Sequence, residues 1–197
     1  MIDDERADAE ISVPLYAFDV CEVRAFVDEI KRIKAHTLGR HAPRHNDDLE
    51  LLEMTAGKLG EVAFGRCFGC GVDWTIYPGG DHGYDFRMWT GDTIDVKAIA
   101  VERNLDHDYR LPLFDVDLTR GASHFVQVLI SPCRGFGLIT GAISRTRFKA
   151  HAIAVDDPKW DRHVVECPRV VTRSQLSRAF PVAWFLEPPA PGEGRPL

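Results

Sequence analysis

A short apolar run with two charges inside it constrains the fold of this chain more than any other feature. Residues 93–100 read TIDVKAIA, a β-branched stretch of strand length that follows a turn at residues 90–92. Side chains alternate along a strand, so Asp95 and Lys97 share one face. The opposite face carries Ile94, Val96 and Ala98. Such a strand needs a covering layer on its apolar face and polar partners for the charged pair on the other.

Amphipathic helices are predicted before this strand. Apolar residues recur at three- and four-residue spacings over residues 19–36 and again over residues 47–68, and the first helix should end near Gly39. Gly57 and Gly60 lie inside the second helix, where each is about 1 kcal/mol less favourable than alanine. We therefore expect another part of the chain to approach this helix closely.

Strand-like runs occupy most of the remaining chain. They cover residues 72–77, 85–89, 93–100, 125–130 and 136–143, with a loop at residues 78–83, and helical patterning returns at residues 145–152 and 172–179. Each apolar face needs a covering layer. The sequence thus predicts an α/β fold, with a mixed central sheet of about five strands flanked by helices.

Composition favours one soluble domain. The chain has 197 residues and is 45% hydrophobic, enough for one sizeable core, so we expect a single domain over residues 1–187 and a Pro- and Gly-rich tail over residues 188–197. The acidic N-terminus is unlike a secretory signal and no run is apolar enough to span a membrane. Five cysteines without framework spacing indicate a reducing compartment. We expect a cytoplasmic protein without disulfides or a membrane partner.

Charge is unevenly distributed along the chain. The formal net charge of −6 argues against a protein that coats nucleic acid indiscriminately. Residues 31–45 nevertheless contain five Lys or Arg residues and no acidic one, and Arg145, Arg147 and Lys149 form a second basic cluster. Each patch could follow a phosphate backbone or simply be a solvated surface.

The turn at residues 90–92 decides whether the acidic side chains can meet. A three-residue loop would set Asp85 opposite Lys97 and leave Asp95 on the adjacent diagonal, whereas a two-residue loop would put Asp85 on the other face. Carboxylate oxygens suit a hard cation such as Mg²⁺, which keeps waters and takes phosphate oxygens as further ligands. Glu61 on the preceding helix could add a carboxylate. Lys97 could orient or deprotonate a metal-bound water, or stabilise developing negative charge.

These residues carry a family resemblance. The segments GKLGEVAF, GYDF and IDVKA, in this order, resemble the core of the PD-(D/E)xK nuclease superfamily over about residues 47–145. The resemblance implies a restriction-endonuclease-like fold that hydrolyses phosphodiester bonds in DNA with Mg²⁺ or Mn²⁺. It implies metal binding by Glu61, Asp85, Asp95 and the backbone carbonyl of Val96, and a catalytic role for these three acids and Lys97.

Three further residues are candidate substrate contacts. Lys58 shares a helix face with Glu61 and could contact phosphate or pair with Glu61. His82 lies in the loop before Asp85. Gln127 lies on the later strand HFVQVLI. Tyr84 stands where the family name has proline.

Other functions remain open from sequence. A protein of the same fold could bind nucleic acid without cutting it. Cys67 and Cys70 have the spacing of a zinc or redox pair. They are better interpreted as two small hydrophobic residues buried in the core. RNA remains open as a substrate beside DNA, as do endo and exo attack. No separate recognition domain is visible, so specificity would have to come from loops, a homodimer partner or another protein.

Overall fold

The computed structural model describes residues 11–37, 47–77, 82–88, 90–101, 110–131, 134–151, 153–155 and 162–166. Its elements are β1 (Ile11–Pro14), α1 (Ala17–Thr37), α2 (Asp47–Phe68), β2 (Phe86–Arg87), β3 (Thr93–Ala100), β4 (Arg110–Phe114), α3 (Asp115–Thr119), β5 (His124–Ser131), β6 (Phe136–Ser144), α4 (Arg145–His151), β7 (Ile153–Val155) and β8 (Arg162–Glu166). The predicted helix at residues 172–179 and the tail at residues 188–197 lie outside the described residues.

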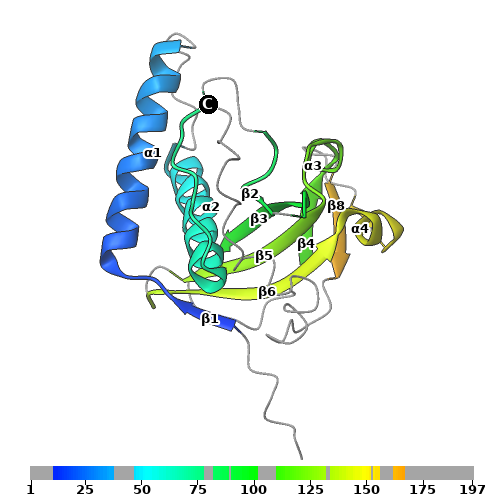
Figure 1. Ribbon diagram of the computed structural model, residues 1–197. Coiled ribbons are helices and arrows are strands. Elements are labelled where there is room, and N and C mark those ends of the chain that lie inside the picture. Colours follow the sequence, from blue (N-terminus) through cyan, green and yellow to red (C-terminus); the bar gives the residue numbers. More distant parts are fainter. Residues whose placement is uncertain are drawn as a thin grey trace, which may run out of the picture.

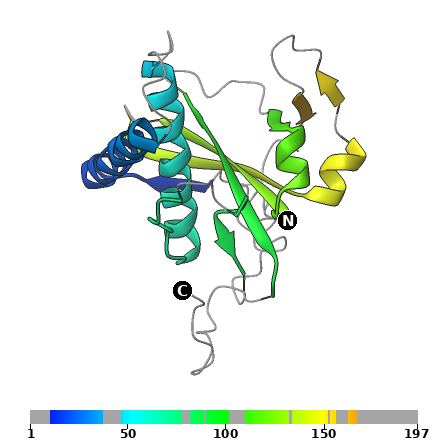
Figure 2. The same ribbon diagram turned by 90° about the horizontal axis from the view of Figure 1, so that it is seen from above.

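The described strands form a mixed five-stranded sheet in the order β1-β6-β5-β3-β2 and a three-stranded sheet in the order β4-β8-β7. Strands β3 and β5 run parallel, and the other neighbours in the larger sheet run antiparallel. Helices α1 and α2 lie on one side of the large sheet, and α3 and α4 lie on the other (Figures 1 and 2). The expected mixed sheet of about five strands flanked by helices is confirmed.

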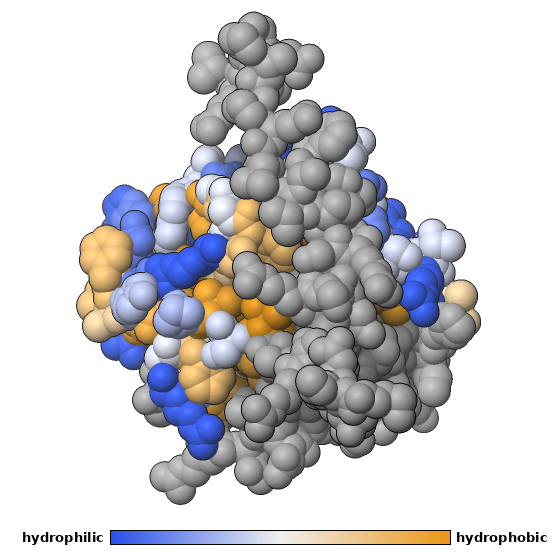
Figure 3. Space-filling view, turned by 60° about the horizontal axis from the view of Figure 1, so that its bottom comes forward, coloured by the Kyte–Doolittle hydropathy of each residue, from blue (hydrophilic) through white to orange (hydrophobic). Residues whose placement is uncertain are grey.

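The main core lies between the two long helices and the large sheet. It joins Leu59, Ala63 and Phe64 of α2 to Ile94 and Val96 of β3, all nearly or fully inaccessible to solvent. Because β3 turns these apolar residues toward α2, its intervening polar residues lie on the face away from that helix. The apolar surface is not wholly covered: on the face in Figure 3, hydrophobic side chains lie among hydrophilic ones.

The helix predictions hold where the structure describes them. Helices α1 and α2 match residues 19–36 and 47–68, and α4 matches residues 145–152 to within a residue. The close approach that two helical glycines suggested is confirmed at Gly60, where an added Cβ would lie 2.6 Å from the Cβ of Ala98 on β3. At Gly57 that expectation is wrong, because an added Cβ would meet nothing within 4 Å.

Two strand predictions fail. Residues 72–77 form no strand; within them the side chain of Asp73 accepts a hydrogen bond from the backbone N–H of Thr75 at 2.9 Å, a local contact that competes with strand pairing. The fifth strand of the sheet is instead β1. The strand predicted at residues 85–89 shrinks to the two residues of β2. The three-stranded sheet and α3 were not predicted.

The hairpin register differs from the predicted one by two residues. Phe86 pairs with Ile94, and the ladder closes where the N–H of Met88 donates to the carbonyl of Asp92 at 2.7 Å. Gly91 in the turn has a φ of 89°, a conformation that glycine adopts without strain. The pairing therefore brings Asp85 level with Asp95 rather than opposite Lys97. The parity is as predicted, so Asp85 still approaches the charged pair.

None of the helices in the described part of the chain is both long and apolar enough to cross a bilayer.

Candidate metal and catalytic site

Asp85 marks the point where the β2–β3 ladder ends. Its carboxylate oxygen Oδ2 accepts a hydrogen bond from the backbone N–H of Val96 at 2.6 Å. A side chain thus takes the place that a carbonyl of β2 would occupy if pairing continued. This contact fixes the carboxylate of Asp85 at the edge of β3.

The charge of Asp85 is unfavourable in this position. Burial raises the pKa of its carboxyl group well above the usual 3.8, and the negative charges of Glu61 and Asp95 raise it further. The Val96 N–H and the ammonium of Lys97 act in the opposite direction but do not offset these effects. The structure therefore brings together the three acids that the sequence singled out, closely enough for them to repel one another.

Lys97 is held between two carboxylates. Its Nζ lies 2.9 Å from Oδ2 of Asp95 and 2.9 Å from Oδ1 of Asp117. Burial lowers the pKa of Lys97, but the two carboxylates outweigh burial and the net pKa is raised. The ammonium is therefore charged at neutral pH, which favours charge stabilisation or water orientation over proton abstraction.

Sequence reasoning missed Asp117. It is 4% exposed and lies on the five-residue helix α3, which precedes β5 in the chain. No motif marks it: the segment DVDLT contains two aspartates, and only the fold shows that Asp117 reaches Lys97. The one available signal was an acidic residue within a largely apolar stretch, which requires a polar partner if buried.

Glu61 approaches Asp85 from α2. Its Oε2 accepts a hydrogen bond from Nζ of Lys58 at 2.6 Å, within an ion pair whose side chains are 15% and 10% exposed respectively. Lys58 also donates to the carbonyl of Asp73, and its ammonium lies 4.9 Å from the ring centre of Phe26 and 5.2 Å from that of Trp74. The ion pair that the sequence left open is thus present, and a phosphate contact by Lys58 stays a prediction.

The donor atoms around Asp85 match a hard divalent cation in kind. In an extended strand the N–H and C=O of one residue point to the same side, so the carbonyl of Val96 faces the same edge as its N–H, toward Asp85. Three carboxylates and a carbonyl are the oxygen ligands that Mg²⁺ accepts, and a cation would relieve their repulsion. In their present positions, however, no three His, Cys, Asp or Glu side chains of the described residues are grouped to hold a metal ion. Glu61 and Asp95 are bonded to lysines instead.

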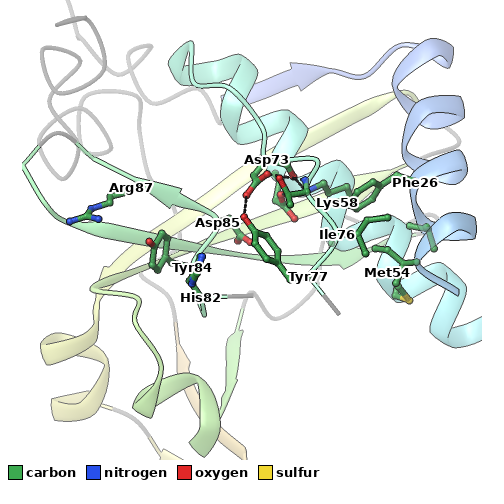
Figure 4. A pocket seen from close by; sticks show the side chains of 15 residues that line it. Phe26, Met54, Lys58, Asp73, Ile76, Tyr77, His82, Tyr84, Asp85 and Arg87 are labelled. Atoms are coloured by element: carbon green, nitrogen blue, oxygen red, sulfur yellow. Dashed lines mark hydrogen bonds and ion pairs between the residues drawn. The ribbon is translucent and has the colours of Figure 1, made fainter. Parts of the chain in front are cut away.

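A pocket of about 680 Å³ opens beside the acids. Glu61 and Asp85 line it together with Lys58 and His82, so two of the three candidate substrate contacts border it. Figure 4 shows Asp85 close to the rings that line this pocket. Gln127 is fully buried next to Lys97 in the β3–β5 register, and its Oε1 accepts a hydrogen bond from Thr140 at 3.0 Å. Its side chain is therefore closed to solvent.

The cysteine pair has the character of core packing. Cys67 and Cys70 are both partly buried against the main core. Burial raises the pKa of Cys70 to about 11, which opposes the thiolate form that zinc binding and redox chemistry require.

The basic patches are only partly described. Arg147 and Lys149 are exposed on α4, while Arg32 forms an ion pair with Glu29 at 2.6 Å. Residues 38–46, which complete the first patch, lie outside the described residues.

No protein family and no curated protein matches this chain. The candidate function therefore rests on the arrangement of residues 61, 85, 95 and 97 and on the resemblance of the segments that carry them.

Proposed function

We propose that this protein is a divalent-metal-dependent nuclease that hydrolyses phosphodiester bonds in DNA, with a restriction-endonuclease-like fold. The observation that carries the proposal is the convergence of Glu61 and Asp95 on the partly buried Asp85, with Lys97 beside them. Carboxylates that repel one another in a buried position are typical of a site adapted to bind a cation. The order of the elements, a helix with Glu61 followed by strands with Asp85 and Asp95, agrees with the resemblance.

In this proposal Mg²⁺ or Mn²⁺ would be held by the three acids and the carbonyl of Val96. The metal would supply Lewis-acid polarisation of the phosphate and a bound water of lowered pKa. The chain itself supplies orientation. Asp85 is fixed at the edge of β3 by the Val96 N–H. Glu61 would leave Lys58 to bind the metal, and Asp95 would bind it while still contacting Lys97.

Lys97 has the role of a positioned charge. Two carboxylates fix its ammonium group at 2.9 Å each, so Nζ need not reorganise when negative charge develops on the phosphate. The Lys97 ammonium donates a hydrogen bond to a phosphate oxygen or to the attacking water.

A second candidate is a protein of the same fold that binds nucleic acid without cutting it. It is favoured by the ion pairs of Glu61 with Lys58 and of Asp95 with Lys97, which already neutralise two of the proposed ligands.

Cleavage assays separate the two candidates. Supercoiled, linear and single-stranded DNA, and RNA, are incubated with millimolar Mg²⁺ or Mn²⁺ and wild type, Asp95→Asn or Lys97→Met. Asp28→Asn, which changes an exposed carboxylate on α1, is the matched control. We expect metal-dependent cutting by wild type and the control, and a loss of at least about 100-fold in both site variants. Binding without cutting by wild type would favour the second candidate, and equal cutting by all four proteins would refute the proposed site.

A further inference from the structure

The pocket beside Asp85 has two unlike walls. Helices α1 and α2 contribute an aliphatic and aromatic wall that includes Phe26, Ile30 and Met54. The loop segments before β2 contribute Tyr77, His82 and Tyr84. Figure 4 shows Phe26 and Met54 toward one end and Arg87 at the other, with the three rings and Asp85 between them. A flat ring in this pocket would have apolar and aromatic side chains to pack against.

The rings of the second wall form a row. The ring centres of Tyr77 and His82 are 5.3 Å apart, and those of His82 and Tyr84 are 6.0 Å apart with their planes within 26° of each other. The hydroxyl of Tyr77 donates to the carboxylate of Asp73 at 2.8 Å, so this ring is held in place before any ligand arrives. Tyr77 is 36% exposed, which leaves ring surface open for stacking.

Polar groups border the pocket at its inner side. Glu61, Asp73 and Asp85 offer acceptors, and Lys58 offers a donor. Ligand sites commonly combine apolar walls with a few polar groups, in volumes of about 300–1,000 Å³. The pocket of about 680 Å³ falls within that range and accommodates a nucleotide but not a base-paired duplex.

We propose that this pocket binds an unpaired nucleobase next to the phosphodiester bond that is cut, so the enzyme acts on single-stranded or frayed DNA. A base in a duplex has both faces covered by its neighbours, so only an unpaired base can enter and stack on the rings. This inference rests on the proposed nuclease function for its biological meaning. The binding that it requires is measurable without cleavage.

Gly57 offers a way to close the pocket without disturbing the fold. It lines the pocket from α2, and an added Cβ there meets nothing within 4 Å. Gly57→Phe therefore places a phenyl group in open space, and the replacement of a helical glycine favours the helix. Leu52→Phe is the matched control, because Leu52 is 42% exposed on the same helix and is not among the residues that line the pocket.

The test measures binding of a short single-stranded oligonucleotide and of a blunt hairpin of equal length, first in EDTA and then with Ca²⁺. The single strand carries a fluorescent adenine analogue that reports loss of base stacking. We expect wild type and Leu52→Phe to bind the single strand at least about tenfold more tightly than the hairpin, and Gly57→Phe to lose this preference. Thermal unfolding checks that each variant is folded.

The outcomes separate this inference from the nuclease proposal. Equal affinity of wild type for the two oligonucleotides, or an unchanged preference in Gly57→Phe, would overturn the pocket assignment even if DNA is cut. A preference for the single strand that Gly57→Phe abolishes would support the assignment, even if wild type cuts nothing and the nuclease proposal fails.

Discussion

At the scale of single residues, Asp85 is the group whose charge the fold tolerates least. The raised pKa of its carboxyl group means that its ionisation destabilises the folded chain at neutral pH. We expect Asp85→Asn to stabilise the metal-free protein by about 1 kcal/mol, because the amide oxygen can still accept the Val96 N–H while the repulsion disappears. The gain should vanish below the ordinary carboxyl pKa of 3.8, where both states of wild type are protonated.

Thermal unfolding in EDTA across this pH range measures the effect. Asp73→Asn is the control, since its carboxylate accepts hydrogen bonds from Thr75 and Tyr77 and its pKa is lowered, because these bonds outweigh burial. We expect Asp73→Asn to lower the free energy of unfolding, whereas Asp85→Asn raises it. If Asp85→Asn instead destabilises the protein at neutral pH, repulsion among the acids does not destabilise the folded wild type.

Asp117 is a positioning residue for Lys97. Asp117→Asn keeps the shape of the side chain but removes one of the two charges that hold the ammonium. We expect kcat for DNA cleavage to fall by about 10- to 100-fold with little change in KM, as for other residues that support a site through a second residue. Asp117→Glu should recover part of the loss. A change in KM alone, or an unfolded Asp117→Asn, would assign Asp117 to substrate binding or to folding.

Some residues of the site could be predicted from the sequence and others could not, for a physical reason. Asp95 and Lys97 lie two apart on one strand, so their shared face follows from the backbone alone. Asp117 lies twenty positions after Lys97 in the chain, and only the packing of α3 brings the two side chains together. Its role could not be read from spacing.

At the scale of elements, Gly57 and Gly60 of α2 form a matched pair. Gly57 faces open space and Gly60 faces Ala98 of β3. We expect Gly57→Ala to stabilise the protein by about 1 kcal/mol through helix propensity. Gly60→Ala should instead destabilise it by about 1–3 kcal/mol, because the new methyl group pushes β3 away from α2. Chemical denaturation of both variants tests this, and equal effects would contradict the helix–strand contact.

An ion pair links the beginning of α1 to the end of α2. The guanidinium of Arg66 donates to both carboxylate oxygens of Asp19, at 2.6 and 2.9 Å. Burial raises the pKa of Asp19, but Arg66 and the N–H of Tyr16 outweigh it and the net pKa is lowered. We expect Arg66→Met to cost about 1–2 kcal/mol at neutral pH, a value that allows for the partial exposure of Arg66.

The pH dependence of this ion pair has a definite sign. A lowered folded-state pKa gives stability that is present above the unfolded value of 3.8 and is lost as pH falls through the folded value. The difference in unfolding free energy between wild type and Arg66→Met should therefore shrink in acid. A difference that stays constant down to low pH would show that Arg66 acts through packing against Tyr16, not through charge.

Elements with strong periodicity could be predicted, whereas short ones could not. The long helices and β3, β5 and β6 follow from repeated apolar spacing. Residues 72–77 look equally strand-like but form no strand, because β-branched composition alone does not determine pairing. The two-residue difference in the hairpin register arises because the turn begins one residue earlier than expected, after Met88.

At the scale of the whole molecule, the site depends on both layers of helices. Helices α2 and α3 lie on opposite sides of the large sheet (Figures 1 and 2). Helix α2 carries Glu61 and α3 carries Asp117. The carboxylate of Asp85 lies where β2 stops pairing with β3. The sequence predicted a mixed sheet covered by helices. It did not predict the three-stranded sheet of β4, β8 and β7, whose strands are short and in which β4 pairs with β8 across a long separation in the chain.

The proposed function requires that the acids around Asp85 bind a divalent cation. Calorimetric titration of Mn²⁺ into metal-free wild type and Asp85→Asn tests it most directly, because binding is measured without substrate and Asn preserves the contact with Val96. We predict saturable binding to wild type and a loss of at least about tenfold in affinity in Asp85→Asn. Absence of binding to wild type, or equal binding to both proteins, would show that the acids around Asp85 do not form a cation site.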